Sequence, residues 1–474
     1  MNRKAGWADR AAGVLLASAA GDALGAGYEF TYPSSETLIA MIGGGPFGFD
    51  PGEWTDDTSM AVALARVTAT GLDVRTPKGL DAVAAGFAEW YSSKPKDIGN
   101  QTRSVLSARD TSGAAMQATA RRLTGRKGGN GSLMRTAAVG IAYLDDAGAC
   151  LEAAEQVSAL THDDQRAHQA CQLWSYAIRY AVLHGTFEGV RSFLDVVGGE
   201  TAGYWTSLID QGETGIPQDF ANNGWVVHAL QTAWWAITHA DQSDATHLQK
   251  ALELAVRAGH DTDTTAAIAG GLLGARWGAS AVPAAWRRIL HGWPGLHAKD
   301  LISLAALTAS GGRDDSQGWP SIERIDYAGQ GWRTGYAAVP HPHDAGVLLG
   351  GYDAAFAGRT DAVVSLCRMG SADLGVEHVE FWLKDAGPQQ NPNLEFLLDD
   401  AARTIRALRS EGKTVLLHCV EGMSRTPSVA ARYSILLGQD PKDVTKAMTW
   451  SRPDRELWAV ATGALSPAEP ISDP

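Results

Sequence analysis

The sequence is poor in cysteine and contains no long hydrophobic run. Only four cysteines occur among 474 residues, at positions 150, 171, 367 and 419, and their spacing is not that of a metal site. A disulfide-rich scaffold is therefore not expected, and reduced thiols in a cytoplasmic setting fit best. Apolar stretches stay shorter than the roughly 18 residues that a membrane span needs. We therefore expect no membrane-spanning helix.

Positive charge is also scarce. The chain has 40 Lys and Arg residues against 53 Asp and Glu residues, which gives a formal net charge of −13. This balance argues against non-specific binding to nucleic acids or membranes. Hydrophobic residues make up 45% and charged residues 20%, which is typical of globular proteins. The length predicts two or three domains.

The N-terminus begins with basic residues followed by an apolar run, so a signal peptide has to be considered. The run from Ala11 to Ala20 is rich in alanine rather than leucine, and it continues into the motif GDALG. We interpret GDALG as part of a functional site, which cleavage there would destroy. No targeting segment is therefore expected.

The chain predicts a multidomain protein with three parts. Residues 1–310 form an N-terminal all-α domain, because apolar residues recur at three- and four-residue spacing in 58–70, 80–92, 150–160, 166–184, 226–239, 246–258 and 264–275. Residues 311–335 are rich in Gly, Asp, Ser and Pro and predict a linker. Residues 336–474 predict a C-terminal α/β domain, because β-type runs at 345–349, 362–367, 379–383 and 414–418 alternate with helical stretches at 394–409, 426–437 and 441–449.

Two segments of the first domain combine acidic and hydroxyl residues within apolar helical sequence. One is Thr55-Asp56-Asp57-Thr58, and the other runs from Gly259 through Asp261 and Asp263 to Thr264. Neighbouring carboxylates repel each other, so burying several of them requires a counter-charge, and Mg²⁺ prefers such oxygen ligands. The alternative is helix capping, which accounts for one acidic residue per segment but not for all of them.

Three further segments belong with these two. GDALG is followed by Glu29, Asp97 begins the motif DIGN, and a glycine loop opens a helix at 128–135. Backbone N–H groups at such a helix start can bind phosphate oxygens, although a plain turn is the simpler interpretation of a single glycine loop.

In order, GDALG followed by Glu29, then WTDDT, DIGN, GNGSLMR, LTHDD and GxDTDT resemble the motifs of the ADP-ribosylglycohydrolase family across residues 10–300. The resemblance implies an all-α bundle with two Mg²⁺ or Mn²⁺ ions that removes ADP-ribose from arginine, serine or other acceptors. The ions would lower the pKa of a water that attacks the anomeric carbon, through a transition state of oxocarbenium character.

The resemblance also implies roles for individual residues. The expected metal ligands are Glu29, Thr55, Asp56, Asp57, Asp261, Asp263 and Thr264. Asp97 is a candidate acid/base or substrate-orienting carboxylate. The diphosphate and distal ribose would meet Gly129, Asn130, Gly131, Ser132, Leu133 and Met134, and His162 would form the cleft wall. His260 departs from the family pattern, because many relatives carry a second glycine there.

The C-terminal domain contains the segment from His418 to Thr426, between a β-type run and a helical stretch. A cysteine six positions before an arginine, on a strand–loop–helix turn, forms an anion cradle, where loop N–H groups and the helix N-terminus lower the thiol pKa. Arg425 can grip phosphate oxygens with its forked guanidinium. The alternative is a buried structural cysteine beside a surface arginine.

This segment resembles the signature of cysteine-dependent phosphatases of the dual-specificity type, over residues 340–460. The resemblance implies that Cys419 is the nucleophile, Arg425 stabilises the transferring oxygens, Thr426 helps the thiolate leave and His418 supports its ionisation. The expected phosphate-binding loop is Glu421, Gly422, Met423 and Ser424. Asp385 is the candidate general acid, whereas Asp399 and Asp400 are poorer candidates because they fall within a predicted helix.

We therefore expect a bifunctional hydrolase. Its substrates would be an ADP-ribosylated protein or a small-molecule ADP-ribose derivative, and a phosphorylated compound. The alternative is a single-activity ADP-ribosyl hydrolase whose phosphatase-like domain is a binding module for a phosphorylated ligand. The sequence leaves open which acceptor carries the ADP-ribose.

Overall fold

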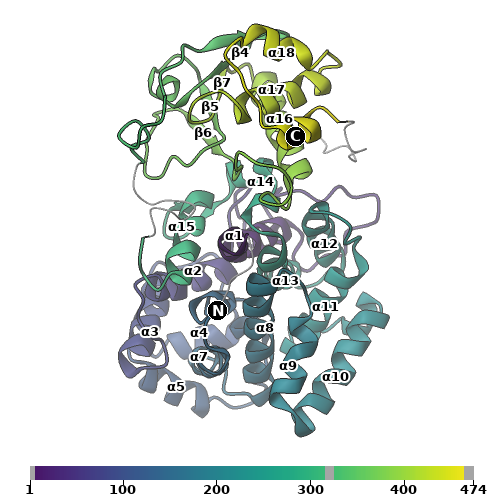
Figure 1. Cartoon of the computed structure of the whole chain (residues 1–474). Coiled ribbons are helices and arrows are strands. Elements are labelled where there is room, and N and C mark those ends of the chain that lie inside the picture. Colours follow the sequence, from purple (N-terminus) through teal and green to yellow (C-terminus); the bar gives the residue numbers. More distant parts are fainter. Residues whose placement is uncertain (1–5, 315–324, 464–474) are drawn as a thin grey trace. The chain divides into compact units, whose positions relative to one another are not determined.

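Two units make up the structure, a computed structural model that describes residues 6–314 and 325–463 (Figure 1). The first unit comprises Met1–Val282 and Ile289–Asp314, and the second comprises Pro283–Arg288 and Asp315–Pro474. The segment Pro283–Arg288, which the sequence assigns to the first domain, therefore packs with the second unit. Part of the predicted linker, residues 315–324, lies outside the described residues.

The first unit is helical, which confirms the predicted fold class of this part. Its α-helices are α1 (Trp7–Gly25), α2 (Asp56–Thr68), α3 (Pro77–Ser92), α4 (Asn100–Leu106), α5 (Gly113–Arg122), α6 (Ala137–Ala142), α7 (Ala147–Ala159), α8 (Gln165–His184), α9 (Gly189–Val197), α10 (Gly199–Thr214), α11 (Val226–His239), α12 (Thr246–Arg257), α13 (Thr262–Trp277) and α15 (Ala298–Ala309). A small antiparallel pair, β1 (His291–Gly292) with β2 (Leu296–His297), is an addition that the sequence did not predict.

Helices α1 and α13 pack against each other in the middle of this unit (Figure 1). Their backbones come unusually close: a Cβ atom added to Gly274 would lie 2.0 Å from the carbonyl oxygen of Gly13, and one added to Gly21 would lie 2.2 Å from that of Ala266. Every residue of α1 from Asp9 to Gly25 is buried. The alanine-rich N-terminal run is therefore the central helix of this unit.

The close approach continues to the ends of the two helices. A Cβ atom added to Gly25, the last residue of α1, would lie 2.5 Å from the Cα atom of Asp263 in the first turn of α13. The C-terminal end of α1 thus meets the N-terminal end of α13, and α2 also begins nearby, because the backbone N–H of Thr55 donates to Asp22. Acidic residues of three helices are brought to one place by this packing.

The second unit is an α/β arrangement with a five-stranded sheet in the order β3-β4-β7-β5-β6. Its strands are β3 (Val339–His341), β4 (Asp344–Gly350), β5 (Ala362–Ser365), β6 (Glu377–Glu380) and β7 (Val415–His418), and its main helices are α16 (Leu394–Ser410), α17 (Arg425–Leu436), α18 (Lys442–Ala447) and α19 (Arg455–Ala461). All neighbours are parallel except β3 with β4. The predicted α/β character with a largely parallel sheet is confirmed.

The second unit also incorporates α14 (Ala284–Ile289), through the residues Pro283–Arg288. Ala284 is part of the hydrophobic core of the unit, and its backbone N–H donates to Oδ2 of Asp400 over 2.9 Å. Arg288 pairs with Glu377 and Glu411. Asp400 is therefore occupied by a structural contact, as is Asp399, which pairs with the buried Arg432.

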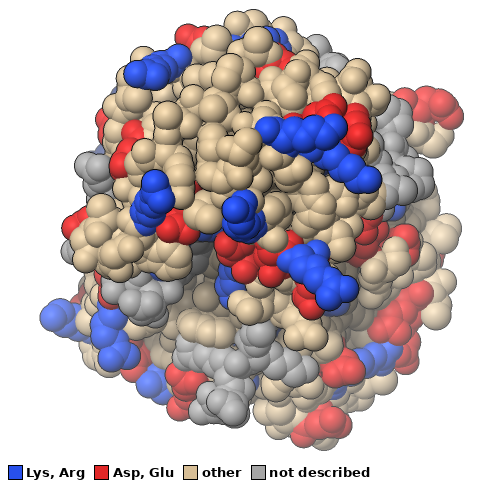
Figure 2. Space-filling view, turned by 45° about the horizontal axis from the view of Figure 1, so that its top comes forward, with Lys and Arg blue, Asp and Glu red and all other residues tan. Residues whose placement is uncertain are grey.

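Two features of composition can be compared with the structure. Across the described residues, no helix combines the length and the apolar character needed to cross a membrane. All four cysteines are free and buried. On the face drawn in Figure 2, basic and acidic side chains lie interspersed among uncharged ones, so that charges on this face are balanced locally.

The contribution of the close contact between α1 and α13 to stability can be tested by adding one methyl group, through a glycine-to-alanine substitution. We expect Gly274→Ala to destabilise the protein by about 1–3 kcal/mol, because the added carbon overlaps the backbone of Gly13. Gly203→Ala is the matched control: this glycine also lies in a helix, but nothing surrounds its added carbon within 4 Å, so a gain of about 0.4–1 kcal/mol is expected. Thermal unfolding of both variants checks the prediction, and equal midpoints would contradict it.

Candidate functional sites

The acidic motifs of the first unit sit at helix N-termini. Thr55 is the N-cap of α2 and its hydroxyl accepts the backbone N–H of Asp57, while Asp261 is the N-cap of α13. The first turn of α2 contains Asp56 and Asp57, and that of α13 contains Asp263. Helix N-termini favour negative charge through their unpaired N–H groups, which explains why local sequence with adjacent carboxylates still begins a helix here.

Asp22 of α1 holds α2 in place. Its carboxylate accepts the backbone N–H groups of Thr55 and Thr58 over about 3 Å and the hydroxyl of Thr58 over 2.6 Å. Asp22 is fully buried. It therefore links α1 to the start of α2 through buried hydrogen bonds, next to the other acidic side chains.

Two groups of carboxylates lie close enough to share a cation. Within each of the groups Asp22–Asp57–Asp263 and Glu29–Asp97–Asp263, one oxygen per residue lies within 4.8 Å of the others. Three buried carboxylate oxygens of these groups have no hydrogen-bond partner within the described part of the chain, namely Oε2 of Glu29, Oδ1 of Asp57 and Oδ1 of Asp263. A buried charged oxygen without a partner is costly, so the cluster is a candidate site for a positive ligand.

Burial and mutual repulsion make the ionised form of these carboxylates unfavourable in the protein alone. Burial, and then repulsion by neighbouring carboxylates, raises the pKa of Glu29 to about 9 and holds the pKa values of Asp56, Asp57 and Asp263 well above the ordinary range. Burial also raises the pKa of Asp22, to about 6. Divalent cations with oxygen ligands fit this donor set, because their charge favours ionised carboxylates. The residues present thus suit Mg²⁺ or Mn²⁺.

The remaining predicted ligands surround this cluster. The hydroxyls of Thr55 and Thr264 both donate to Oδ2 of Asp57, over 3.0 and 3.4 Å. Asp56 accepts the backbone N–H of Gly99, in the DIGN segment. Asp97 of that segment is half-buried, and one of its oxygens accepts the N–H of Ile98 over 2.6 Å. The structure therefore brings the acidic motifs from four separate stretches of the sequence together.

The glycine loop joins the cluster through Asn130. The side-chain amide of Asn130 donates to Oδ2 of Asp261 over 2.8 Å and to the backbone oxygen of Asn223. Asn223 in turn accepts the backbone N–H of Asp261 through its side-chain oxygen. Asp261 is therefore oriented from both sides by amide groups.

A cleft of about 670 Å³ lies beside the glycine loop, lined among others by Gln101, Lys127, Gly129 and Trp225. Gly131 faces the imidazole of His162, which lies behind the loop and is 1% exposed. Ser132, Leu133 and Met134 are buried too. Of the predicted substrate loop, only Gly129 therefore lines this cleft, whereas His162 and the residues from Ser132 onward are buried.

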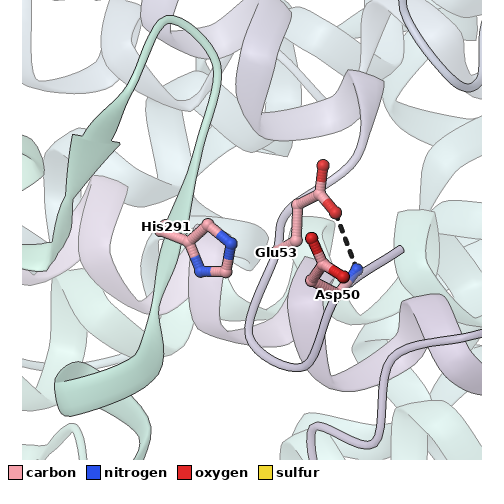
Figure 3. Close-up of side chains that lie close together, drawn as sticks. All are labelled: Asp50, Glu53 and His291. Carbon is pink, nitrogen blue, oxygen red and sulfur yellow. Dashed lines mark hydrogen bonds between the residues drawn. The ribbon is translucent and has the colours of Figure 1, made fainter.

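A third group of possible ligands, Asp50, Glu53 and His291, lies apart from this cluster on a loop and on β1 (Figure 3). The Glu53 carboxylate already accepts the backbone N–H of Asp50 over 2.7 Å and the ammonium of Lys96 over 2.6 Å. Its charge is thus balanced by the protein itself. These residues suit a cation less well than the buried cluster does.

In the second unit, Cys419 follows the central strand β7, and Arg425 begins α17. The backbone N–H of Gly422 donates to Sγ of Cys419 over 3.3 Å, which stabilises a thiolate. Gly422 has φ 74°, and a Cβ atom there would lie 2.8 Å from the oxygen of Gly350. The loop can therefore close around the sulfur only with glycine at this position.

Arg425 and Asp385 are the two charged residues that the sequence predicts to act beside this loop. The Arg425 guanidinium donates to the backbone oxygens of Leu366 and Leu383, and its buried Nε has no hydrogen-bond partner within the described residues. Asp385 is exposed and accepts the hydroxyl of Ser424. Asn391 fastens the Asp385 loop by bonding to the backbone of Lys384 and Ala386. A guanidinium that can bind an anion and a candidate general acid thus border the same loop.

The other predicted residues of the loop have distinct surroundings. The hydroxyl of Thr426 donates to the oxygen of Gly350, and the Glu421 carboxylate accepts the N–H of Arg333. The backbone oxygen of Met423 accepts the N–H of Arg452. These contacts attach the loop to neighbouring segments of the same unit.

His418 is buried and hydrogen-bonded on both ring nitrogens. Nδ1 lies 3.1 Å from the oxygen of Cys419, and Nε2 lies 2.7 Å from Oγ of Ser365, which lies 2.9 Å from Nε2 of His378. Burial lowers the pKa of His418 to about 3, so the ring is neutral at physiological pH. His418 therefore supports Cys419 through hydrogen bonds rather than through a positive charge.

Several residues that organise the sites were missing from the sequence prediction. Asp22 stood within a recognised motif, so the motif could have identified it, although we did not expect its bonds to α2. Asn223 and Ser365 carry no local signal, because each acts through a partner more than 30 positions away in sequence. Contacts of this kind become visible only in the folded chain.

Comparisons with known proteins show the family of the first unit. The family model described as ADP-ribosylglycohydrolase matches residues 3–316. An ADP-ribosylarginine hydrolase of Pseudomonas putida (strain GB-1) is 32% identical over 296 residues, covering 59% of this chain and 73% of that protein. An ADP-ribosyl-(dinitrogen reductase) glycohydrolase of Rhodospirillum rubrum is 28% identical over 290 residues, covering 59% of this chain and 89% of that protein. A solved ADP-ribosylglycohydrolase-related protein complex aligns with a TM-score of 0.51 and 27% identity, over 65% of this chain and 99% of the other.

Proposed function

Because the chain belongs to the ADP-ribosylglycohydrolase family, we propose that its helical unit removes ADP-ribose from a modified acceptor with the help of two Mg²⁺ or Mn²⁺ ions. The observation that carries the metal assignment is the set of buried, unpartnered carboxylate oxygens on Glu29, Asp57 and Asp263. The ions would be held by these residues together with Thr55, Asp56, Asp261 and Thr264. When bound, they would supply positive charge that ionises the carboxylates and polarises substrate hydroxyls.

The protein's own residues then bind and orient the ADP-ribose. The glycine loop at Gly129 and the cleft beside it offer backbone N–H groups and Lys127 to the diphosphate. The bond that breaks joins the anomeric carbon to the acceptor, and the developing positive charge on the sugar is stabilised by the surrounding carboxylates. Asp97, oriented by the N–H of Ile98, is the residue that would take the proton of the attacking water.

We propose arginine as the first acceptor to test, because a relative at 32% identity is an ADP-ribosylarginine hydrolase. A protonated guanidinium can leave as a neutral guanidine, so no separate acid is needed for the leaving group. Serine-linked ADP-ribose and small-molecule ADP-ribose derivatives are the other acceptors that the assay distinguishes.

The activity is tested by ADP-ribose release from arginine- and serine-modified peptides, with Mg²⁺ and with EDTA. We expect EDTA to abolish release, and Asp261→Ala to lower the rate by more than about 100-fold, since it removes a residue at the ions. Glu53→Gln is the control, because this half-buried carboxylate lies in the separate group and its loss leaves the cluster intact. Release that is indifferent to EDTA would contradict the proposal.

The metal site has a second test that does not depend on activity. In EDTA, we expect Asp57→Asn to raise the unfolding temperature, because it removes one buried, repelled carboxylate without changing its shape. With Mg²⁺, the wild type should gain stability by mass action and the variant should gain much less. Calorimetric unfolding at several Mg²⁺ concentrations checks both signs. A variant that is stabilised by Mg²⁺ as strongly as the wild type would refute the assignment.

We further propose that the second unit hydrolyses phosphate monoesters through Cys419. The supporting observation is the pairing of a thiol that accepts the Gly422 N–H with the buried, unpartnered Nε of Arg425. The Cys419 thiolate would attack phosphorus, forming a P–S bond as the ester P–O bond breaks, and Asp385 would protonate the leaving oxygen. Water would then release phosphate, with Thr426 assisting the departing thiolate. The alternative is a module that binds a phosphorylated ligand without turnover.

Hydrolysis of p-nitrophenyl phosphate separates these two functions. We expect the wild type to hydrolyse this compound and Cys419→Ser not to. For a phosphate ester with a poor leaving group, we expect the kcat of Asp385→Asn to be about 100-fold lower than that of the wild type. Asp373→Asn is the control, because this aspartate of the same unit lies outside the Cys419 loop and its carboxylate accepts the backbone N–H of Gly375. Phosphate binding by calorimetry without any turnover would leave the binding module as the function.

A further inference from the structure

Two non-glycine residues with left-handed backbone flank the carboxylate cluster. Phe30 has φ 60° and directly follows Glu29, and His260 has φ 64° and directly precedes Asp261. This conformation is costly for residues with a side chain, and it persists where the surrounding structure enforces it, often at functional sites. Glycine would adopt it without cost, but these two positions carry aromatic rings, as Lys94 and Arg109 carry long side chains at the other left-handed non-glycine positions of the described chain.

The two residues are fastened to each other through the backbone. The N–H of Phe30 donates to the oxygen of His260 over 2.6 Å, and the N–H of His260 donates to the oxygen of Thr31 over 3.0 Å. Farther along the same loop, the Arg257 guanidinium donates to the oxygens of Ser34 and Thr37. The loop that carries Phe30 is therefore held at both ends, and its rings are preorganised rather than loosely attached.

The side chains of this region form an exposed aromatic surface. The ring centroids of Phe30 and His260 lie 5.8 Å apart at an interplanar angle of 80°. Phe30 is 57% exposed and Tyr32 is 64% exposed. The Tyr32 ring lies against Gly259, where a Cβ atom would come within 2.2 Å of it. We call Phe30, Tyr32 and His260 the aromatic rim.

The exposed aromatic faces of the rim favour one ligand chemistry. A ring face attracts cations, and a guanidinium is planar and weakly hydrated, so it stacks on such faces better than an ammonium does. Glu29 and Asp261, the chain neighbours of the rim, are proposed ligands of the ions, so the rim borders the place where the bond to the acceptor breaks. A neutral hydroxyl acceptor gains no cation–π interaction.

We propose that the aromatic rim is the acceptor subsite of the helical unit and binds the guanidinium of ADP-ribosylated arginine. The inference rests on the proposed function, and it adds the residues that read the acceptor. Phe30 and Tyr32 provide the faces on which the guanidinium lies, and His260 sets the position of the Phe30 ring by its edge contact. The phosphate cleft at Gly129 receives the other half of the substrate.

An adenine base is the competing occupant, because it also stacks on aromatic rings. The two occupants differ in what they affect. A rim that holds the adenine contributes equally to every ADP-ribosylated substrate and to free ADP-ribose, whereas a rim that holds the acceptor contributes only when the acceptor is a guanidinium. The ratio of kcat/KM for the arginine-linked peptide to that for the serine-linked peptide, together with the inhibition constant of ADP-ribose, therefore distinguishes the two occupants.

The experiment compares kcat/KM for arginine- and serine-ADP-ribosylated peptides of the same sequence in the full-length protein with Mg²⁺. The variants are Phe30→Leu, which keeps apolar bulk but removes the ring face, and His260→Gly, which keeps the left-handed backbone. We expect each to lower kcat/KM for the arginine-linked peptide by about ten-fold through KM, within the range of a partly desolvated cation–π contact. The serine-linked rate, where there is one, and the inhibition constant of ADP-ribose should stay within about two-fold.

Ile216→Ala is the matched control, because Ile216 is an exposed apolar residue of the same unit that lies outside both sites. It should leave all three quantities unchanged. Equal losses on both peptides, or a parallel rise in the inhibition constant of ADP-ribose, would overturn the acceptor subsite while the proposed function stands. A wild type that releases ADP-ribose from neither peptide would overturn both. Unfolding midpoints of the variants identify any loss that comes from instability alone.

Discussion

The direct contact between the backbones of α1 and α13 is the constraint on which the helical unit depends. Glycine at positions 13, 21 and 274 lets the two helices approach until no side chain fits between them. Because the helices meet at the end of one and the start of the other, Asp22 and Asp263 are carried into the same buried region. The packing that lowers the free energy of the fold thereby concentrates negative charge, and this repulsion has to be offset. A divalent cation would offset it, so the fold and the proposed chemistry depend on each other.

The two candidate sites of the chain have opposite charge. In the first unit, buried carboxylates have raised pKa values and unpartnered oxygens, and they need a positive ligand. In the second unit, the N–H of Gly422, the start of α17 and the guanidinium of Arg425 converge around one thiol, so the loop needs a negative ligand. His418 stays neutral there, since a charge in that buried position would be unfavourable without a partner. The phosphorylated compound proposed for the second site and the cation proposed for the first follow from the same physical reasoning.

The sequence predicted the helical and α/β character of the two units because periodicity is a local property. Each predicted helix between 58 and 275 corresponds to a helix of the structure, with ends that differ by a few residues at caps such as Thr55 and Thr76. The ordered motifs also pointed to the residues that gather in the carboxylate cluster. The partners of Asp261 were not predictable, since Asn130 and Asn223 reach it across long stretches of chain. The place of the residues Pro283–Arg288 was not predictable either. Their composition predicts a helix in whichever unit they pack, and the contact with Asp400 attaches them to the second unit.

Local rules fail in the structure where the functional site begins. Glycine rather than phenylalanine or histidine is expected at a left-handed position, and the backbone hydrogen bonds between Phe30, Thr31 and His260 enforce the exception. Sequences that specify one fold agree with local preferences almost everywhere, and exceptions concentrate at functional sites. The strain at Phe30 and His260 is borne next to Glu29 and Asp261, within reach of the proposed ions. We attribute this conformational cost to recognition of the group that departs there, because the Phe30 ring is 57% exposed and contributes little to packing.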